Sequence, residues 1–117
     1  MLGCVSGVLC CMIFIETPVF TRRAIELLDH DAYLHLQLQL VADPRAGDVI
    51  EGSGGVRKIR VAAKGHGKRG GGRVIYYHFV SASRIAMLMI YAKGEKSDLS
   101  VQERKILKAA IEHWSHL

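Results

Sequence analysis

The spacing of apolar residues predicts four strands. Three runs rich in Val, Ile and Tyr have the composition of strands and span residues 56–63, 73–80 and 85–91. A shorter run covers residues 12–15. The segment between the last two long runs, with Ser81-Ala82-Ser83 at its start, is short enough for a hairpin, and residues 64–72 form a longer, glycine-rich connection between the first two. The pattern therefore indicates a small, largely antiparallel sheet.

The N-terminal region carries two helix signals. Thr17-Pro18 is typical of a helix start, because threonine caps and proline tolerates the first turn. Residues 33–40 alternate with period two, as a half-buried strand does. Leucine and glutamine are nevertheless helix formers, and Asp29 offers an N-cap. We therefore predict a second helix over residues 31–42.

The C-terminal region predicts a third helix. Ser100 and Glu103 have the spacing of a capping box. Apolar residues then recur at spacings of three, four and seven: Ile106, Leu107, Ala110, Ile111 and Trp114. The element order β-α-α-β-β-β-α predicts an α+β fold, a small largely antiparallel sheet with two N-terminal helices and a C-terminal helix. We expect the helices to cover one face of this sheet.

Length and composition indicate one folded domain. The chain has 117 residues, half of them apolar and only two of them proline. We treat residues 1–11 as an apolar N-terminal extension, either a start-site artefact or a frayed tail, and residues 12–117 as the domain. All three cysteines lie in that extension, so we expect no disulfide framework. No apolar stretch has the length of a membrane span and no secretory signal is recognisable, so we expect a cytoplasmic protein.

Charge is segregated along the chain. The sequence holds 16 Lys and Arg and 11 Asp and Glu, a net charge of +5. Nine of these cations and no acid lie between Gly52 and Gly94, so the other 74 residues carry seven cations and eleven acids, a net charge of −4. Such a basic segment is typical of nucleic-acid binding. The competing interpretation is a solvated basic surface without a partner.

Strand alternation predicts that some of these cations share one face. Lys58 and Arg60 lie two residues apart on one predicted strand. Arg73 begins the next strand, and Tyr91 and Lys93 lie at the end of the last. We expect these residues to form a concave cationic face with the glycine-rich loop at its rim. For the tyrosine, ordinary core packing is an equal alternative.

The glycine-rich loop does not have the context of a nucleotide-binding motif. Residues 65–70 fit the pattern G-x-G-x-x-G, but they lead into a strand, and no acid follows about twenty residues later to bind a ribose. His66, in the basic loop, is the histidine best placed for proton transfer. No histidine pair has the H-x₃-H or H-E-x-x-H spacing, so we expect neither a metal nor another cofactor.

Five blocks of sequence, in order and spacing, resemble the RelE/ParE toxin superfamily and most closely its HigB-like branch. They read DPRAGDVI (43–50), GGVRKIRV (54–61), KGHGKRGGG (64–72), RVIYY (73–77) and YAKGEKSDL (91–99). The resemblance implies a toxin of a type II toxin–antitoxin system that binds the ribosomal A site and cleaves mRNA there. It also implies a cognate antitoxin, in this branch usually a helix-turn-helix protein (HigA-like), and a C-terminal helix that is mobile or displaced.

The resemblance also implies site residues. The two basic positions of the family's second strand fall on Lys58 and Arg60, and the arginine that opens its third strand falls on Arg73, the expected phosphate clamp. Gly94 stands where RelE has an arginine, and Ser100 stands where RelE has a catalytic tyrosine. The identity of the general base therefore stays open.

Metal-free RNA cleavage needs a group that takes the 2′-hydroxyl proton, cations that stabilise the phosphorane, and a donor for the leaving 5′-oxygen. We expect neighbouring cations to lower the pKa of a lysine or tyrosine enough for proton transfer. The catalytic candidates are Arg73, Tyr91, Lys93 and Lys68. The candidates for RNA or ribosome binding are Lys58, Arg60, Lys64, His66, Arg69 and Lys96.

Two other functions stay open. A non-catalytic RNA or ribosome binder would inhibit translation by occupation, and the absence of the family's tyrosine is compatible with that activity. A ParE-like gyrase poison is the third interpretation. The basic glycine-rich loop and the spacing of Tyr91 and Lys93 favour the RNA-cleaving side of the superfamily over it.

Overall fold

The computed structural model describes residues 12–63, 71–80, 83–95 and 98–115. The elements in chain order are β1 (Ile13–Glu16), α1 (Pro18–Leu27), α2 (His30–Ala42), β2 (Asp48–Val49), β3 (Arg57–Ala63), β4 (Gly71–Phe79), β5 (Arg84–Ala92) and α4 (Val101–Ser115). The strands form one sheet in the order β1-β5-β4-β3-β2, in which β1 is parallel to β5 and the other neighbours are antiparallel. The predicted α+β fold is confirmed.

The cap of α1 also connects the helix to the sheet. Thr17 Oγ1 accepts a hydrogen bond from Phe20 N at 3.0 Å and donates one to the carbonyl oxygen of Leu88 at 2.8 Å. Pro18 occupies the first helical position, where its missing N–H costs nothing. The predicted helix start is therefore confirmed, and one hydroxyl fixes the crossing from β1 into α1 against β5.

The segment that alternates with period two is a helix, as predicted. Asp29 Oδ1 caps α2 by accepting a hydrogen bond from Ala32 N at 2.7 Å. Leu36 and Leu40, one turn apart, are buried, whereas Leu38 is 49% exposed. Helix propensity and the cap outweigh the alternating pattern. Because the segment is a helix, every second leucine in it is only partly buried.

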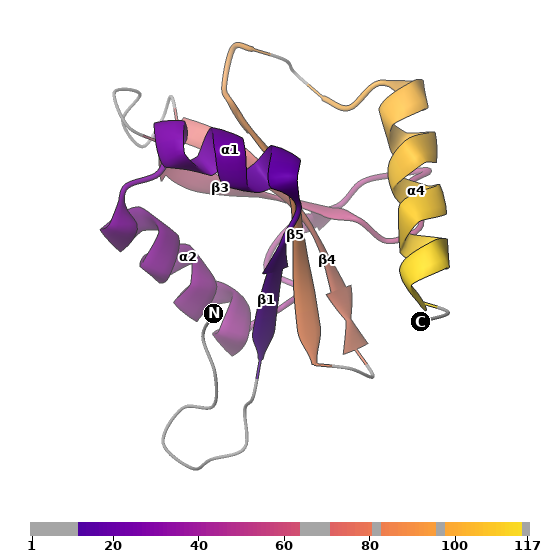
Figure 1. Ribbon diagram of the computed structural model, residues 1–117, viewed down its shortest axis with the longest axis horizontal. Helices are drawn as coiled ribbons and strands as arrows, with labels where there is room; N and C mark the ends of the chain where they lie inside the picture. The colour runs from indigo at the N-terminus through magenta and orange to yellow at the C-terminus, as the bar shows by residue number, and fades with distance from the viewer. Residues whose placement is uncertain (1–11, 64–70, 81–82, 96–97, 116–117) are drawn as a thin grey trace.

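Helices cover both faces of the sheet, so the prediction that they cover one face is wrong (Figure 1). On one face, α1 and α2 form a core with Val74 and Tyr76 of β4. On the other, Ile111 of α4 forms a second core with Ile75 of β4 and Leu88 of β5. Successive β4 residues alternate between these cores. Because both faces of the central strands are apolar, each face needs its own cover.

The segment between α2 and β3 contains a two-residue strand, β2, which the sequence does not predict. Two residues carry no recognisable hydrophobic period. The fully buried Tyr76 fixes this loop on the sheet, because its hydroxyl donates to the carbonyl oxygen of Pro44 at 2.8 Å and accepts from Gly47 N at 2.9 Å. A Cβ atom at position 47 would lie 2.8 Å from the carbonyl oxygen of Lys58, so only glycine allows this approach.

The capping box at the start of α4 is confirmed. Ser100 Oγ accepts a hydrogen bond from Glu103 N at 3.1 Å, and Glu103 Oε1 accepts one from Ser100 N at 2.9 Å. Ile111 is buried, but Ile106 is 57% exposed, so the apolar stripe is narrower than predicted. Among the described helices, none has the length and apolar character to cross a membrane.

Candidate nucleic-acid interface

Three predicted site residues form one row across the sheet. In the register of β3, β4 and β5, Arg60 lies opposite Arg73, and Arg73 lies opposite Tyr91. Directly opposed residues on neighbouring strands share a face and lie about 5 Å apart. Tyr91 belongs to the core beneath α4, so the row lies on the α4 face of the sheet. We refer to Arg60, Arg73 and Tyr91 as the cross-strand row.

The two arginines of the cross-strand row carry like charges at directly opposed positions. Their repulsion destabilises the sheet at this point. Arg60 is exposed and Arg73 is half-buried. Neither forms an ion pair with a carboxylate of the described residues, and Arg73 Nη1 donates to the carbonyl oxygen of Gly72 at 3.1 Å. A phosphate bound by both guanidinium groups would remove the repulsion through charge-assisted hydrogen bonds. The row is therefore suited to an anion.

Lys58 lies on the same face, opposite Ile75 of β4, but an acid already contacts it. Its Nζ is 3.6 Å from Asp98 Oδ1, and Asp98 Oδ2 is 3.2 Å from Arg104 Nη2 on α4. A hydrogen bond from Leu99 N, together with these two cations, holds the pKa of Asp98 below its ordinary value. Asp98 is therefore a carboxylate at neutral pH, and it occupies part of the face that the sequence predicts to be purely cationic.

Tyr91 is a buried phenol that keeps its proton at neutral pH. Its side chain is only 5% exposed. Burial raises the pKa of Tyr91. The negative charges of Asp98 and Glu103 raise this pKa as well, whereas the positive charge of Arg73 lowers it. The expectation that neighbouring cations lower the pKa of this tyrosine is therefore wrong, because burial and the two acids near the start of α4 outweigh the arginine.

Lys93 is exposed and follows Tyr91 at the end of β5, where its N–H donates to the carbonyl oxygen of Gly71 at 3.1 Å. Two departures from the RelE pattern nearby have local structural reasons. Gly94 has a φ angle of +102°, a conformation that favours glycine. The Ser100 hydroxyl caps α4 by accepting a hydrogen bond from the backbone. Gly94 therefore allows the turn after β5, and Ser100 caps the helix that follows.

Five predicted site residues lie outside the described residues: Lys64, His66, Lys68, Arg69 and Lys96. Their roles stay predictions. The segment 64–70 joins the end of β3 at Ala63 to the start of β4 at Gly71, and the cross-strand row lies within three residues of both ends. The chain therefore enters and leaves this basic segment beside the two arginines.

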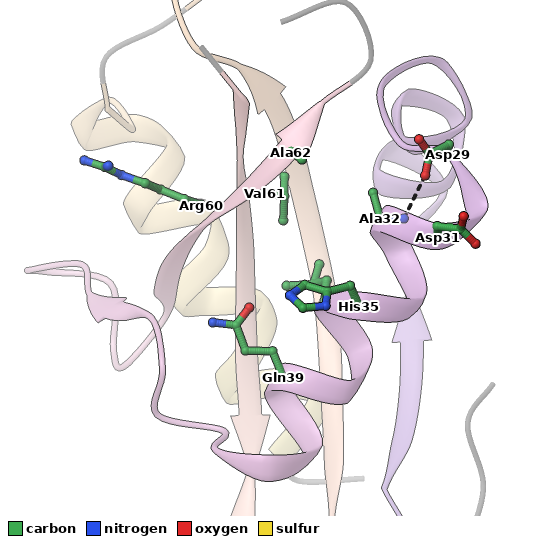
Figure 2. A pocket seen from close by; sticks show the side chains of 9 residues that line it. Asp29, Asp31, Ala32, His35, Gln39, Arg60, Val61 and Ala62 are labelled. Carbon is green, nitrogen blue, oxygen red and sulfur yellow. Dashed lines mark hydrogen bonds between the residues drawn. The ribbon is translucent and has the colours of Figure 1, made fainter. Parts of the chain in front are cut away.

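A cavity of about 640 Å³ lies between α2 and β3, and Arg60 is among the residues that line it (Figure 2). His35 and Gln39 point from α2 toward β3, whereas Arg60 points away from α2. Asp29 at the rim accepts the capping hydrogen bond of α2, and Asp31 adds a second acid. Two acids disfavour a phosphate at this position. Arg60 therefore borders both surfaces: it lines this cavity beside β3, while its side chain points away from α2.

Comparison with known families assigns the chain to one of them. A family model described as the RelE toxin of the RelE / RelB toxin–antitoxin system matches residues 37–117. The matched span contains β2 to β5, α4 and the whole cross-strand row. A toxin of such a system has a cognate antitoxin, so membership implies a protein partner. On these grounds the chain belongs to the RelE toxin family of toxin–antitoxin systems.

Proposed function

We propose that this toxin inhibits translation by cleaving mRNA on the ribosome, as a metal-independent endoribonuclease. The observation that carries the proposal is the pair of opposed arginines, Arg60 and Arg73, which lack an ion-pair partner among the described carboxylates. Two arginines that start from directly opposed positions can both donate hydrogen bonds to one phosphodiester, and their charge suits the extra negative charge of its cleavage transition state. RNA supplies such an anion at every nucleotide.

The residues of the face divide the chemistry as follows. Arg73, the central member of the row, clamps the scissile phosphate, and Arg60 assists it. Tyr91 is protonated at neutral pH, so it suits donation to the leaving 5′-oxygen better than removal of the 2′-hydroxyl proton. Removal of that proton falls to Lys93, which is exposed at the end of β5, or to Lys68 in the basic loop, with His66 as a further candidate.

The test is cleavage of a defined mRNA on translating ribosomes, mapped by primer extension. Arg73→Ala is expected to lower the cleavage rate about 100-fold, because it removes a transition-state cation. Arg84→Ala is the matched control, since Arg84 is an exposed arginine at the other end of the β4–β5 pair, opposite Phe79. Both variants should melt like the parent chain. Undiminished cleavage by folded Arg73→Ala would contradict the assignment of the face.

A second candidate function is translation arrest by occupation, without cleavage. It is favoured by the burial of Tyr91, which leaves proton transfer less complete than anion binding. In that case ribosomes would stall and primer extension would show no cut ends. Both functions predict that binding to ribosomes weakens as salt rises, because phosphate contacts release counterions.

The proposal extends to the partners and the compartment. The ribosomal A site with its mRNA is the target, and the cell compartment is therefore the cytoplasm. The inhibitor is an antitoxin of the HigA-like kind, a folded helix-turn-helix protein, in keeping with the HigB-like sequence blocks. Such a protein holds the helical side of the toxin and prevents entry into the A site by its bulk, without contacting the cross-strand row.

A further inference from the structure

The turn that follows Tyr91 is closed by the side chain of Glu95. Glu95 Oε1 accepts a hydrogen bond from Ala92 N at 2.7 Å, and Glu95 N donates to the carbonyl oxygen of Ala92 at 3.1 Å. Gly94, with its positive φ, lets the chain reverse between them. The turn thus carries Lys93 at its tip and begins directly after the buried tyrosine.

Glu95 also joins this turn to α1. Arg23 Nη2 lies 2.6 Å from Glu95 Oε1, the oxygen that accepts the hydrogen bond from Ala92 N. The hydrogen bond with Glu95 is the main reason that the pKa of Arg23 is raised. Arg23 Nη1 makes a second, longer contact of 3.3 Å with Glu26 on its own helix. A groove of about 290 Å³ between α1 and the end of β5 is lined by all three of these side chains.

The consequence of this contact is positional. The side chains of Arg23 and Glu95 are 32% and 45% exposed, and ion pairs at such positions add little to stability. A single carboxylate oxygen nevertheless receives both the guanidinium and the backbone N–H. Arg23 therefore fixes the carboxylate, and the carboxylate fixes the backbone between Tyr91 and Lys93.

We infer that Glu95, held by Arg23, is a positioning residue for the cleavage reaction: it sets the backbone that places Tyr91 and Lys93 beside Arg73. This inference rests on the proposed function. Neither Arg23 nor Glu95 belongs to the cross-strand row, and neither needs to contact the RNA. Their effect reaches the reaction through the turn, whose first residue, Ala92, pairs with Gly72 next to Arg73.

The experiment compares Glu95→Ala and Arg23→Gln with the control Glu26→Gln, in single-turnover cleavage on ribosomes. Misplacement of catalytic groups by a fraction of an ångström lowers rates strongly, so we expect the cleavage rate at saturating ribosomes to fall about tenfold for both test variants. The half-saturating ribosome concentration should stay within about twofold, because the phosphate-binding cations remain. Glu26→Gln removes the other ion pair of Arg23 and should change neither quantity.

Two conservative variants separate positioning from charge. Glu95→Gln keeps an oxygen for Ala92 N and should retain most of the rate, and Arg23→Lys keeps a cation for the carboxylate. Weaker binding with an unchanged rate at saturation would overturn the inference, since it would show a role in RNA binding. Equal losses in Glu26→Gln and Arg23→Gln would overturn it too.

Hydrogen exchange tests the turn independently of cleavage. The amides of Ala92 and Lys93 should exchange about tenfold faster in Glu95→Ala and Arg23→Gln than in the parent, and should be unchanged in Glu26→Gln. If the parent chain does not cut mRNA, the proposed function fails while this readout still decides whether Glu95 and Arg23 hold the turn. Unchanged exchange in both test variants would refute the clamp even if cleavage were reduced.

Discussion

The two faces of the sheet are used differently. On the face covered by α1 and α2, the β3 side chains Ile59, Val61 and Ala63 all join one apolar core. On the face covered by α4, the same strand presents Lys58 and Arg60, and the apolar core is built by β4, β5, α4 and loop residues such as Val56 and Leu99. One face is thus committed to packing, whereas the other combines packing with charge. We therefore expect the stability of this small toxin to come mainly from the face covered by α1 and α2.

The largest expected effect tests this division. Phe20→Ala removes a fully buried ring from the α1/α2 core and should lower the free energy of unfolding by about 3–5 kcal/mol, measured by urea denaturation. Arg73→Ala, on the other face, should change it by less than about 0.5 kcal/mol. Comparable losses in the free energy of unfolding from both substitutions would show that the basic face also contributes strongly to stability.

The antitoxin is expected to recognise the packing side and not the basic side. In the purified complex, amides of residues 19–40 should exchange about 100-fold more slowly than in the free toxin, because partner binding suppresses local opening. Amides of β3 around Arg60 should change little. Protection concentrated on β3 and β4 at the cross-strand row would instead show direct occlusion of the basic face.

Tyr76→Phe should cost about 1–3 kcal/mol, although it removes a single oxygen. The hydroxyl is buried and makes two hydrogen bonds, with the carbonyl oxygen of Pro44 and with Gly47 N, and both groups would lose their partner. Tyr77→Phe, on the adjacent half-buried position of the other face, is the control. Equal and small effects in denaturant titrations would mean that the β2 loop does not depend on this hydroxyl.

Asp98→Asn should strengthen binding to ribosomes by about threefold at low salt, since it releases Lys58 from a carboxylate on the face that we propose to bind RNA. The gain should disappear as the salt concentration rises, because the effect is electrostatic. Glu112→Gln, an exposed acid near the end of α4, provides a charge-matched control. A decrease in affinity for the asparagine variant would show that Asp98 assists the site instead of competing with phosphate.

The smallest effect is a pH dependence that arises at His78. Burial, followed by Arg45 and Arg57, lowers the pKa of His78 in the folded state. The unfolded chain therefore binds this proton more readily, so stability is complete above a pH of about 6.5 and falls as the pH drops through the lower folded-state pKa. The change should stay below about 1 kcal/mol because the ring is partly solvated, and His78→Gln should flatten it. An unchanged slope in the glutamine variant would exclude His78 as the source.

Local signals in the sequence were sufficient for most of the fold. Caps at Thr17, Asp29 and Ser100 mark the helix starts, and the alternation of apolar residues along β4 assigns both of its faces. The side of the sheet on which α4 lies could not be predicted, because an amphipathic stripe specifies that a helix packs but not on which face. The two residues of β2 were too few to give a pattern.

The candidate site was predictable as a set of cations but not as an electrostatic environment. Strand alternation predicted that Lys58 and Arg60 share a face, whereas the register that opposes Arg60 to Arg73 was not predicted, because the connection between β3 and β4 is too long to fix it. The position of Asp98 against Lys58 depends on how the chain returns from β5 to α4, a tertiary path without a local signal. The pKa of Tyr91 depends on that same path, and so its direction was mispredicted.

The parallel pairing of β1 with β5 has a consequence for how the chain reaches its final state. Residues 13–16 align with residues 84–87, and Thr17 bonds to Leu88 across 71 positions of sequence. Contacts so distant along the chain form late, since the intervening loop must close before they contribute any free energy. Although β1 leaves the ribosome before β5 during synthesis, it can therefore take its place in the sheet only after β5 has been made.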